Sequence, residues 1–185
     1  MRSLPQVAFV DRDGVINAKA AEGAYVTRPE DLVILPGAAT AVRALNDLGS
    51  RVVVVTNQRG IALGHMTEVD LAAVHDAMTI QLARSGARLD GVFHCPHDAG
   101  QCDCRKPEVG LFLRAEREVL GVRIVEAVMI GDGREDMEAA ARLGIPRVLI
   151  ADSTQSSAQA LAGELAVDHI APSLLGAVCW LRDGT

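Results

Sequence analysis

Short runs of apolar residues alternate along this chain with longer segments in which apolar residues recur every three or four positions. The runs are brief and several are apolar throughout, which is typical of strands whose sheet is covered on both faces. They predict strands at residues 7–10, 51–55, 91–94, 127–130 and 147–150, and a weaker strand at 167–170.

The longer segments predict helices, because their apolar residues recur with the period of an α-helix. Thr67 and Asp70 form the pattern of a capping box at the start of one of them, and Gly144 marks the end of another. The expected helices lie at 38–48, 67–86, 107–121, 134–143 and 173–181, and the Ser- and Gln-rich stretch 153–159 is expected to be a loop. This alternation predicts an α/β fold with a doubly wound, Rossmann-like parallel sheet and right-handed crossovers.

The composition is that of one globular domain, which we expect to span residues 1–185. Hydrophobic residues make up 49% of the chain but aromatic residues only 3%, so the core is expected to consist mainly of Ala, Val, Leu and Ile. The formal charge of −6 argues against nucleic acid or an anionic membrane as the main partner. We expect the protein to act as a monomer.

The chain contains no apolar stretch near the ~18–20 residues that a membrane-spanning helix needs. Its first apolar run is interrupted at once by charged residues, unlike a signal peptide. These features predict a cytoplasmic protein. In that reducing compartment, a cluster of cysteines is more often metal-binding or catalytic than disulfide-bonded.

Acidic, basic, hydroxyl and amide side chains directly follow several of the predicted strands. Ligands of parallel α/β sheets bind beyond the carboxyl ends of the strands. Any of these residues taken singly could have a structural role, as a turn former, a helix cap or a solvated loop charge. Their coincidence at strand ends instead predicts one site, made of Asp11, Asp13, Thr56, Asn57, Arg105, Lys106 and Asp132.

This set suits phosphoryl transfer. Carboxylates from two strand ends offer Mg²⁺ the oxygen ligands it prefers. A carboxylate can also attack phosphorus and form an aspartyl-phosphate, while a second carboxylate two residues further on transfers protons. A hydroxyl, an amide and an ammonium group then stabilise the charge on the phosphoryl oxygens.

A second candidate site is the segment Cys95-x-His97-x4-Cys102-x-Cys104, which contains four possible metal ligands. It supplies the Cys₃His ligand set of a closed, structural zinc site, and a disulfide is the alternative that the compartment disfavours. Metal binding would stabilise the loop 95–104, which has little core of its own, and would fix Arg105 and Lys106 directly after it. His94 is expected to lie outside the ligand set, and Cys179 is expected to be a packed apolar residue.

The segments DRDGVIN, TNQ, RKP and GDGRED resemble, in this order, the four motifs of the haloacid dehalogenase-like phosphatases. The resemblance extends from about residue 7 to residue 150. The stretch CPH…CDCRKP and the segment TNQRGIALG resemble the heptose-bisphosphate phosphatase branch. Histidinol-phosphate phosphatases share the cysteine loop and RKP, although Asn17 and the segment 60–62 fit the heptose branch better.

The resemblance implies a role for each residue of the predicted site. Asp11 would be the nucleophile and a Mg²⁺ ligand, and Asp13 would be the general acid and base and bind the metal through its backbone carbonyl. Asp132 would be the second carboxylate ligand. Thr56 and Asn57 would contact the phosphoryl group, and Lys106 would neutralise its charge. Arg105 would recognise the substrate. Asp136 would lie behind the metal ligands and would not bind the metal itself.

The sequence departs from the family pattern at a few positions. Arg59 and Leu63 replace a serine and an arginine, and Gly133 stands where many relatives carry a polar side chain. Arg59 is either a ligand of a second substrate phosphate or a solvated side chain. No insertion is long enough for a large cap domain, and residues 18–35 are expected to form only a small flap over an open site.

The resemblance therefore implies a Mg²⁺-dependent phosphatase that removes the 7-phosphate of D-glycero-D-manno-heptose 1,7-bisphosphate, with structural Zn²⁺ in the cysteine loop. Histidinol phosphate or another small sugar phosphate is the alternative substrate. A receiver domain would carry its phosphoacceptor aspartate on a strand in the middle of the chain, where this sequence has Thr56 and Asn57 instead. A non-catalytic binding module stabilised by zinc is the remaining alternative.

Overall fold

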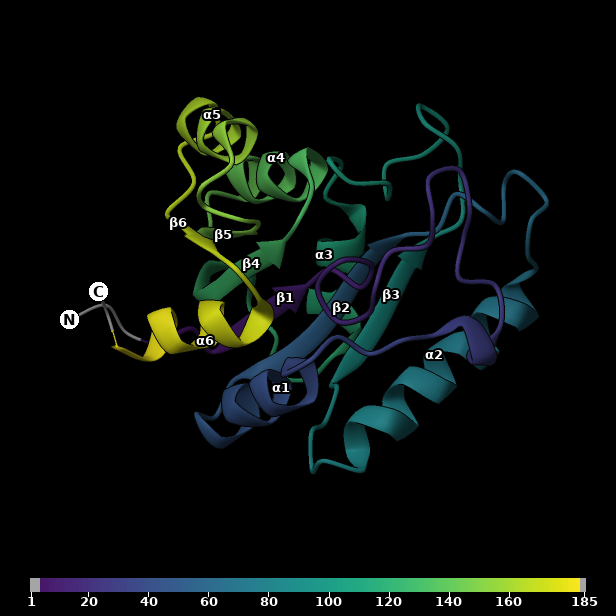
Figure 1. Ribbon diagram of the computed structural model, residues 1–185, viewed down its shortest axis with the longest axis horizontal. Coiled ribbons are helices and arrows are strands. Elements are labelled where there is room, and N and C mark those ends of the chain that lie inside the picture. Colours follow the sequence, from purple (N-terminus) through teal and green to yellow (C-terminus); the bar gives the residue numbers. More distant parts are fainter. Residues whose placement is uncertain (1–3, 184–185) are drawn as a thin grey trace.

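The computed structural model describes residues 4–183, and its centre is a six-stranded sheet in which all neighbouring strands are parallel (Figure 1). The order of the strands is β3-β2-β1-β4-β5-β6. Their bounds are Val7–Val10 for β1, Arg51–Asn57 for β2, Gly91–Cys95 for β3, Ala127–Gly131 for β4, Arg147–Ile150 for β5 and His169–Ala171 for β6. The prediction of a doubly wound α/β fold is confirmed.

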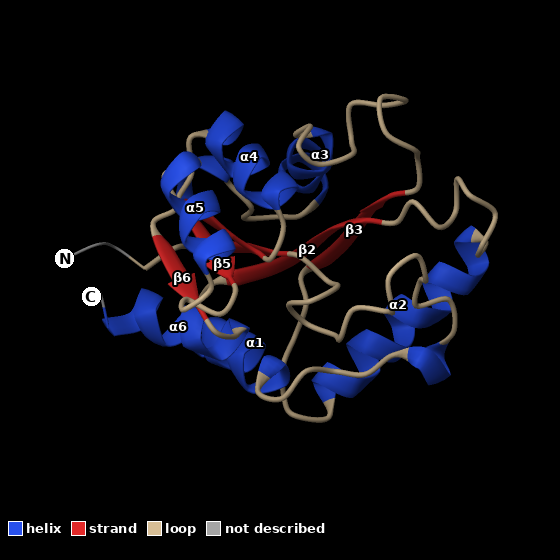
Figure 2. Ribbon diagram, turned by 45° about the horizontal axis from the view of Figure 1, so that its top comes forward, coloured by secondary structure: helices blue, strands red, loops and turns tan. Residues whose placement is uncertain are grey.

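Helices cover both faces of the sheet (Figure 2). One face packs against α1 (Ala38–Asp47), α2 (Glu68–Ala83) and α6 (Leu174–Asp183), and the other against α3 (Gly110–Glu118), α4 (Arg134–Leu143) and α5 (Ser156–Glu164). Two short 3₁₀ helices, η1 (Pro29–Asp31) and η2 (Ile124–Glu126), complete the described elements. Strand β1 serves both cores, because Ala8 and Val10 point to one face and Val7 and Phe9 to the other.

Capping residues and glycines determine where several helices begin or end. Thr67 and Asp70 form the expected capping box of α2, and Gly144 ends α4 with a positive φ of 68°. Other ends differ by a few residues: β2 continues through Thr56 to Asn57, and α3 begins at Gly110 rather than at residue 107. Strand β6 occupies His169–Ala171 instead of residues 167–170.

One expected loop is wrong. Residues 153–159 were expected to lack regular structure, but α5 begins at Ser156 and continues to Glu164. Its polar residues mask a narrow apolar stripe, in which Ala158 is buried in the core and Leu161 packs against it. Helix α5 is thus stabilised mainly by the packing of a few side chains against the core. The composition of the segment alone does not reveal this packing.

The segment between β1 and α1 contains no regular element except η1, so the flap expected at residues 18–35 is small and a large cap domain is absent from this connection. Within residues 4–183, none of the helices has the length and apolar character needed to cross a bilayer.

Candidate active site

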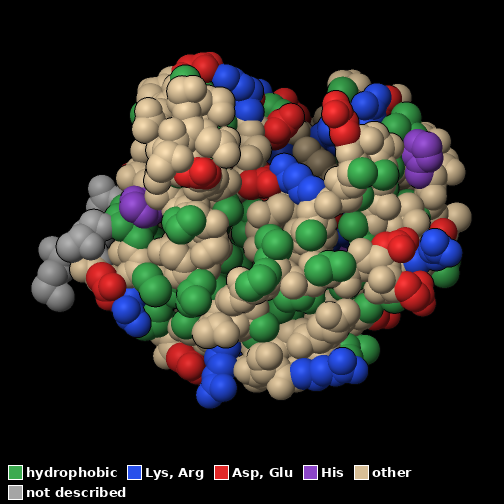
Figure 3. Space-filling model, in the orientation of Figure 1, with side chains coloured by type: hydrophobic (Ala, Val, Ile, Leu, Met, Phe, Trp, Pro, Cys, Tyr) green, Lys and Arg blue, Asp and Glu red, His purple; other side chains and the backbone are tan. Residues whose placement is uncertain are grey.

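The carboxyl ends of β1, β2 and β4 and the segment after the cysteine loop meet around one cavity of about 190 Å³. Figure 3 shows a hollow on this side of the molecule in which acidic and basic side chains gather. The residues that line the cavity are Asp11, Asp13, Lys19, Thr56, Asn57, Arg105, Lys106, Asp132, Gly133, Glu135 and Asp136. Apart from Arg59, every residue predicted to take part in phosphoryl transfer is therefore in this cavity.

Lys106 is the buried cation of the site. Its Nζ donates hydrogen bonds to Asp11 Oδ1 at 2.9 Å and to the carbonyl oxygen of Val55 at 2.7 Å, and lies 2.5 Å from Asp136 Oδ1. Burial would lower the pKa of Lys106, but the carboxylates of Asp11 and Asp136 raise it above its ordinary value. The ammonium group is thus fixed in its charged form beside Asp11.

Asn57 positions this lysine. Its side-chain amide donates to the carbonyl oxygen of Lys106 at 3.0 Å and accepts from the backbone N–H of Lys106 at 3.0 Å. These paired hydrogen bonds join the end of β2 to a residue 49 positions away in the sequence. The expected contact between Asn57 and a phosphoryl group stays a prediction.

Asp13 is held by a network of donors. Arg12 donates to Asp13 Oδ1 through Nη2 at 2.8 Å and Nε at 3.2 Å, Asn17 donates to the same oxygen, and Gln58 donates to Oδ2. Burial would raise the pKa of Asp13, but the Arg12 guanidinium and these hydrogen bonds hold it below its usual value. Arg12 is itself buried, and its Nη1 lies 3.2 Å from His75 Nε2 on α2.

Gln58 also donates to the Thr56 hydroxyl at 2.9 Å, so one amide orients both the acid and the hydroxyl that face the cavity. The sequence alone indicated no role for Arg12 or Gln58, although they lie in the motifs DRDGVIN and TNQ. Their contacts with Asp13 and Thr56 depend on the folded arrangement of the strand ends.

Three carboxylates form a group that can hold a metal ion. One oxygen each of Asp11, Asp132 and Asp136 lies within 4.8 Å of the others. Burial raises the pKa of Asp11 to about 6, against the opposing effect of Lys106, and burial also raises the pKa of Asp132. A divalent cation would offset the cost of placing these charges together, and the all-oxygen donor set fits Mg²⁺.

Asp136 also has a structural role, because its Oδ2 accepts a hydrogen bond from the backbone N–H of Gly133 at 3.0 Å at the start of α4. The sequence-based prediction placed this residue behind the metal ligands. Asp136 contacts Gly133 and Lys106 and also lies within reach of a metal ion beside Asp11 and Asp132, so its position behind the ligands stays a prediction.

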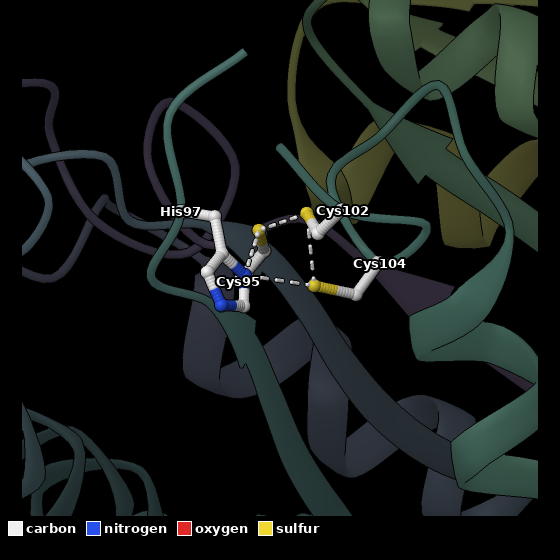
Figure 4. A group of neighbouring side chains, drawn as sticks. All are labelled: Cys95, His97, Cys102 and Cys104. Carbon is white, nitrogen blue, oxygen red and sulfur yellow. Dashed lines mark hydrogen bonds between the residues drawn. The ribbon is translucent and has the colours of Figure 1, made fainter. Parts of the chain in front are cut away.

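The four side chains of the cysteine loop point toward one another (Figure 4). Cys102 Sγ lies 3.5 Å from Cys95 Sγ and 3.3 Å from Cys104 Sγ, and His97 Nδ1 lies 3.3 Å from Cys104 Sγ and 3.7 Å from Cys95 Sγ. A tetrahedral zinc site has ligand separations of about 3.5–3.8 Å, given Zn–S bonds of about 2.3 Å. The cysteines are not disulfide-bonded, so this cluster has the chemistry and dimensions of a metal site.

The arginines expected to contact substrate lie in different environments. Arg105 lines the cavity, and its Nη1 is buried with no hydrogen-bond partner among residues 4–183. Arg59 does not line the cavity: its Nε lies 2.6 Å from Asp98 Oδ1. Because Asp98 belongs to the cysteine loop, Arg59 connects that loop to the segment after β2.

Two residues of the cavity were missed by the sequence analysis. Lys19 reaches it from the flap, and its Nζ lies 2.7 Å from Asp132 Oδ2. Glu135 lines the cavity and lies in the motif GDGRED, but the sequence alone indicated no role for it. Lys19 belongs to no motif and follows no strand, so no local signal identified it.

Known proteins resemble this chain in sequence. A family model described as HAD-hydrolase-like matches residues 103–177. The D-glycero-beta-D-manno-heptose-1,7-bisphosphate 7-phosphatase of Yersinia pestis is 35% identical over 182 residues, which cover 94% of this chain and 93% of that protein. A D-glycero-alpha-D-manno-heptose-1,7-bisphosphate 7-phosphatase from Mycobacterium bovis is 41% identical over 133 residues, covering 71% of this chain and 70% of that protein.

Solved structures resemble it as well. The D,D-heptose 1,7-bisphosphate phosphatase from B. bronchiseptica, complexed with magnesium and phosphate, aligns with a TM-score of 0.83 and 28% identity, over 97% of this chain and 99% of that chain. The D,D-heptose 1,7-bisphosphate phosphatase from Burkholderia thailandensis aligns with a TM-score of 0.66 and 26% identity, over 94% and 96% of the two chains.

Proposed function

The chain belongs to the D-glycero-D-manno-heptose-1,7-bisphosphate 7-phosphatases of the haloacid dehalogenase-like hydrolases, and we propose that it removes the 7-phosphate of such a bisphosphate. It is a phosphatase, a hydrolase of phosphate esters. The observation that supports the proposed chemistry most is the contact between Lys106 Nζ and Asp11 Oδ1 at 2.9 Å, inside a cavity that three further aspartates line.

In this proposal Asp11 is the nucleophile. Its carboxylate oxygen attacks the phosphorus of the 7-phosphate, an aspartyl-phosphate forms, and the bond from phosphorus to the sugar oxygen breaks. Lys106 lies beside Asp11 and neutralises charge on the phosphoryl oxygens, and the Thr56 hydroxyl at the end of β2 donates a hydrogen bond to them. Water then hydrolyses the acyl phosphate, which releases inorganic phosphate and restores the carboxylate of Asp11.

Asp13 transfers the protons. It donates one to the leaving sugar oxygen and later removes one from the attacking water, which is the sequence that a two-step hydrolysis requires. The donors Arg12, Asn17 and Gln58 fix the position of this carboxylate. Since they also lower its pKa, Asp13 is suited to the second step as a base and must receive a proton before the first.

Mg²⁺ would be held by Asp11, Asp132 and the backbone carbonyl of Asp13. When bound, it would supply positive charge against the phosphoryl oxygens. Zn²⁺ would be held by Cys95, His97, Cys102 and Cys104, with a structural role. The free thiols of the described cysteines suit a reducing environment, and we place the enzyme in the cytoplasm.

A substrate panel tests the proposal. Purified enzyme with Mg²⁺ is given both anomers of the heptose 1,7-bisphosphate, histidinol phosphate and p-nitrophenyl phosphate, and released phosphate is measured. We expect kcat/KM to be highest for one of the heptose bisphosphates. A higher value for histidinol phosphate would overturn the assignment of substrate without affecting the assignment as a phosphatase.

The variant Asp11→Asn tests the mechanism. Loss of the nucleophile should lower kcat by about a thousandfold or more, because the proposed covalent intermediate forms on the Asp11 carboxylate and an amide cannot replace it. The exposed residue Asp76 on α2 offers a matched control, since Asp76→Asn removes the same charge away from the cavity. Equal turnover by Asp11→Asn and the wild type would exclude covalent catalysis through this residue.

A further inference from the structure

Building on the proposed function, we propose that Lys19 is a substrate-specificity residue that binds the second, distal phosphate group of the bisphosphate. Lys19 lies in the flap of residues 18–35 and is the only cavity-lining residue that this segment contributes. Its position shows how a small flap, without a large cap domain, can help to select a doubly phosphorylated substrate.

The cations of the cavity differ in how far they reach toward solvent. The side chain of Lys106 is 3% exposed and lies against Asp11, where the reacting phosphate would bind. The side chain of Lys19 is 58% exposed, although its Nζ still reaches Asp132. Lys19 is thus placed at the mouth of the site, where the far end of a small substrate would lie.

The charge of the cavity favours a role for each of its cations in binding a bisphosphate. Among the lining residues, five are acidic and three are basic, which gives 3 − 5 = −2. One bound Mg²⁺ would balance this charge, leaving no surplus for a substrate that carries two phosphate groups. Lys106 is already paired with Asp11 and Asp136, which leaves Lys19 and Arg105 as the cavity-lining cations that can bind the distal phosphate.

Lys19 and Arg105 come from separate segments, the flap and the chain that follows the cysteine loop. Arg105 Nη1 is buried and lacks a hydrogen-bond partner within the described residues, which leaves a donor available for an anion at the cavity. An ammonium and a guanidinium from two walls can bind one phosphate group together, each through charge-assisted hydrogen bonds.

The ion pair between Lys19 and Asp132 does not oppose this role. Asp132 Oδ2 accepts the ammonium at 2.7 Å, and Asp132 is also one of the carboxylates grouped for a metal ion. A divalent cation at that carboxylate would compete with Lys19 for its charge. The long, flexible lysine side chain could then pair with the substrate without breaking any part of the fold.

Two substrates that differ only in the distal phosphate test this inference. The ratio of kcat/KM for heptose 1,7-bisphosphate to that for heptose 7-phosphate is measured for the wild type, Lys19→Ala and Lys19→Arg. We expect Lys19→Ala to lower this ratio by about tenfold or more, as for the loss of one charge-assisted hydrogen bond. Lys19→Arg should restore most of it.

A binding measurement separates recognition from turnover. In the Asp11→Asn background, calorimetry should give a Kd for the bisphosphate that is about tenfold weaker when Lys19→Ala is added. Arg28→Ala is the matched control, because Arg28 is a flap cation that is 73% exposed, pairs with Asp31 and does not line the cavity. That control should leave both the ratio and the Kd unchanged.

An equal loss on both substrates would overturn the inference and assign Lys19 to the metal-binding carboxylates instead. Unchanged kcat/KM values for both substrates in Lys19→Ala would also overturn it. Failure of the proposed function has a different signature: the wild type itself would then fail to prefer heptose bisphosphate over histidinol phosphate, whichever residue stands at position 19.

Discussion

At the residue scale, Gly14 controls where Asp132 can lie. Gly14 has a φ of 88°, and a Cβ built at this position would lie 1.8 Å from Asp132 Oδ2. A side chain here would therefore force the Asp132 carboxylate to move. The glycine after the two aspartates of DRDG thus serves both the turn that follows β1 and the carboxylate that follows β4.

Gly14→Ala should weaken Mg²⁺ binding. We expect the Kd for Mg²⁺ to rise by about tenfold or more, the usual effect of disturbing a residue that orients a metal ligand. Gly49→Ala is the control: Gly49 has a similar φ of 85°, but a Cβ there would meet nothing within 4 Å. Both variants should lose about 1 kcal/mol of unfolding free energy. Calorimetry with Mg²⁺ that shows equal affinity in both variants would contradict the steric argument.

Single residues could be predicted from the sequence where they stand in a short motif directly after a strand. Asp11 and Asp132 are of this kind, because β1 and β4 are neighbours in a parallel sheet. Arg59 could not be assigned, because its partner Asp98 lies 39 residues away in an irregular loop. Lys19 escaped notice for the same reason, since only the folded chain brings it to Asp132.

At the scale of elements, the cysteine loop connects the group of Cys95, His97, Cys102 and Cys104 to the buried Lys106. Between the end of β3 and the start of α3 there is no regular element, and Gly110 N–H donates to the carbonyl oxygen of Asp103 across the loop. Lys106 follows the last cysteine by two positions and is fixed by Asn57. Order in the loop is therefore coupled to the position of the ammonium group beside Asp11.

Cys102→Ser should lower both metal content and activity. We expect elemental analysis to find little zinc in the variant and kcat to fall by about tenfold or more, because loss of a ligand removes the binding energy that orders the loop. Cys179→Ser is the matched control, since Cys179 lies on α6 outside the cluster. Normal turnover in a zinc-free Cys102→Ser variant would rule out this role for the loop.

The elements that the sequence predicted well have strong local signals at their ends. Helix α4 was expected at residues 134–143 and is found at Arg134–Leu143, since Gly144 takes the left-handed conformation that terminates it. Helix α5 has no side-chain cap at Gln155, and only Ala158 among its residues is buried. Its weak apolar stripe explains why the polar composition of 153–159 indicated a loop.

At the scale of the whole molecule, the sequence predicted the layers but not the order of the strands. Apolar runs alternating with amphipathic segments are sufficient to predict a parallel sheet between helices. They do not indicate that β1 lies in the middle, between β2 and β4. That arrangement depends on which faces pack together in space, and it is what brings Asp11, Thr56 and Asp132 to one cavity.

Two of the few aromatic residues of the chain meet in the core. The chain has three phenylalanines, and two of them, Phe9 on β1 and Phe112 on α3, meet edge to face with ring centroids 4.9 Å apart. Both are fully buried in the core that lies between the sheet and α3, α4 and α5. Because Asp11 directly follows β1, this contact supports the strand that places the Asp11 carboxylate in the cavity.

Phe112→Ala should therefore destabilise the whole protein. We expect a loss of about 3–5 kcal/mol of unfolding free energy in urea titrations, since neighbours that are already packed cannot fill the cavity left by the ring. This is a large part of the roughly 5–15 kcal/mol that holds a typical domain folded. Leu113→Ala, one position along α3 and 41% exposed, should cost far less. Similar losses in the two variants would show that the aromatic pair is not central to the core.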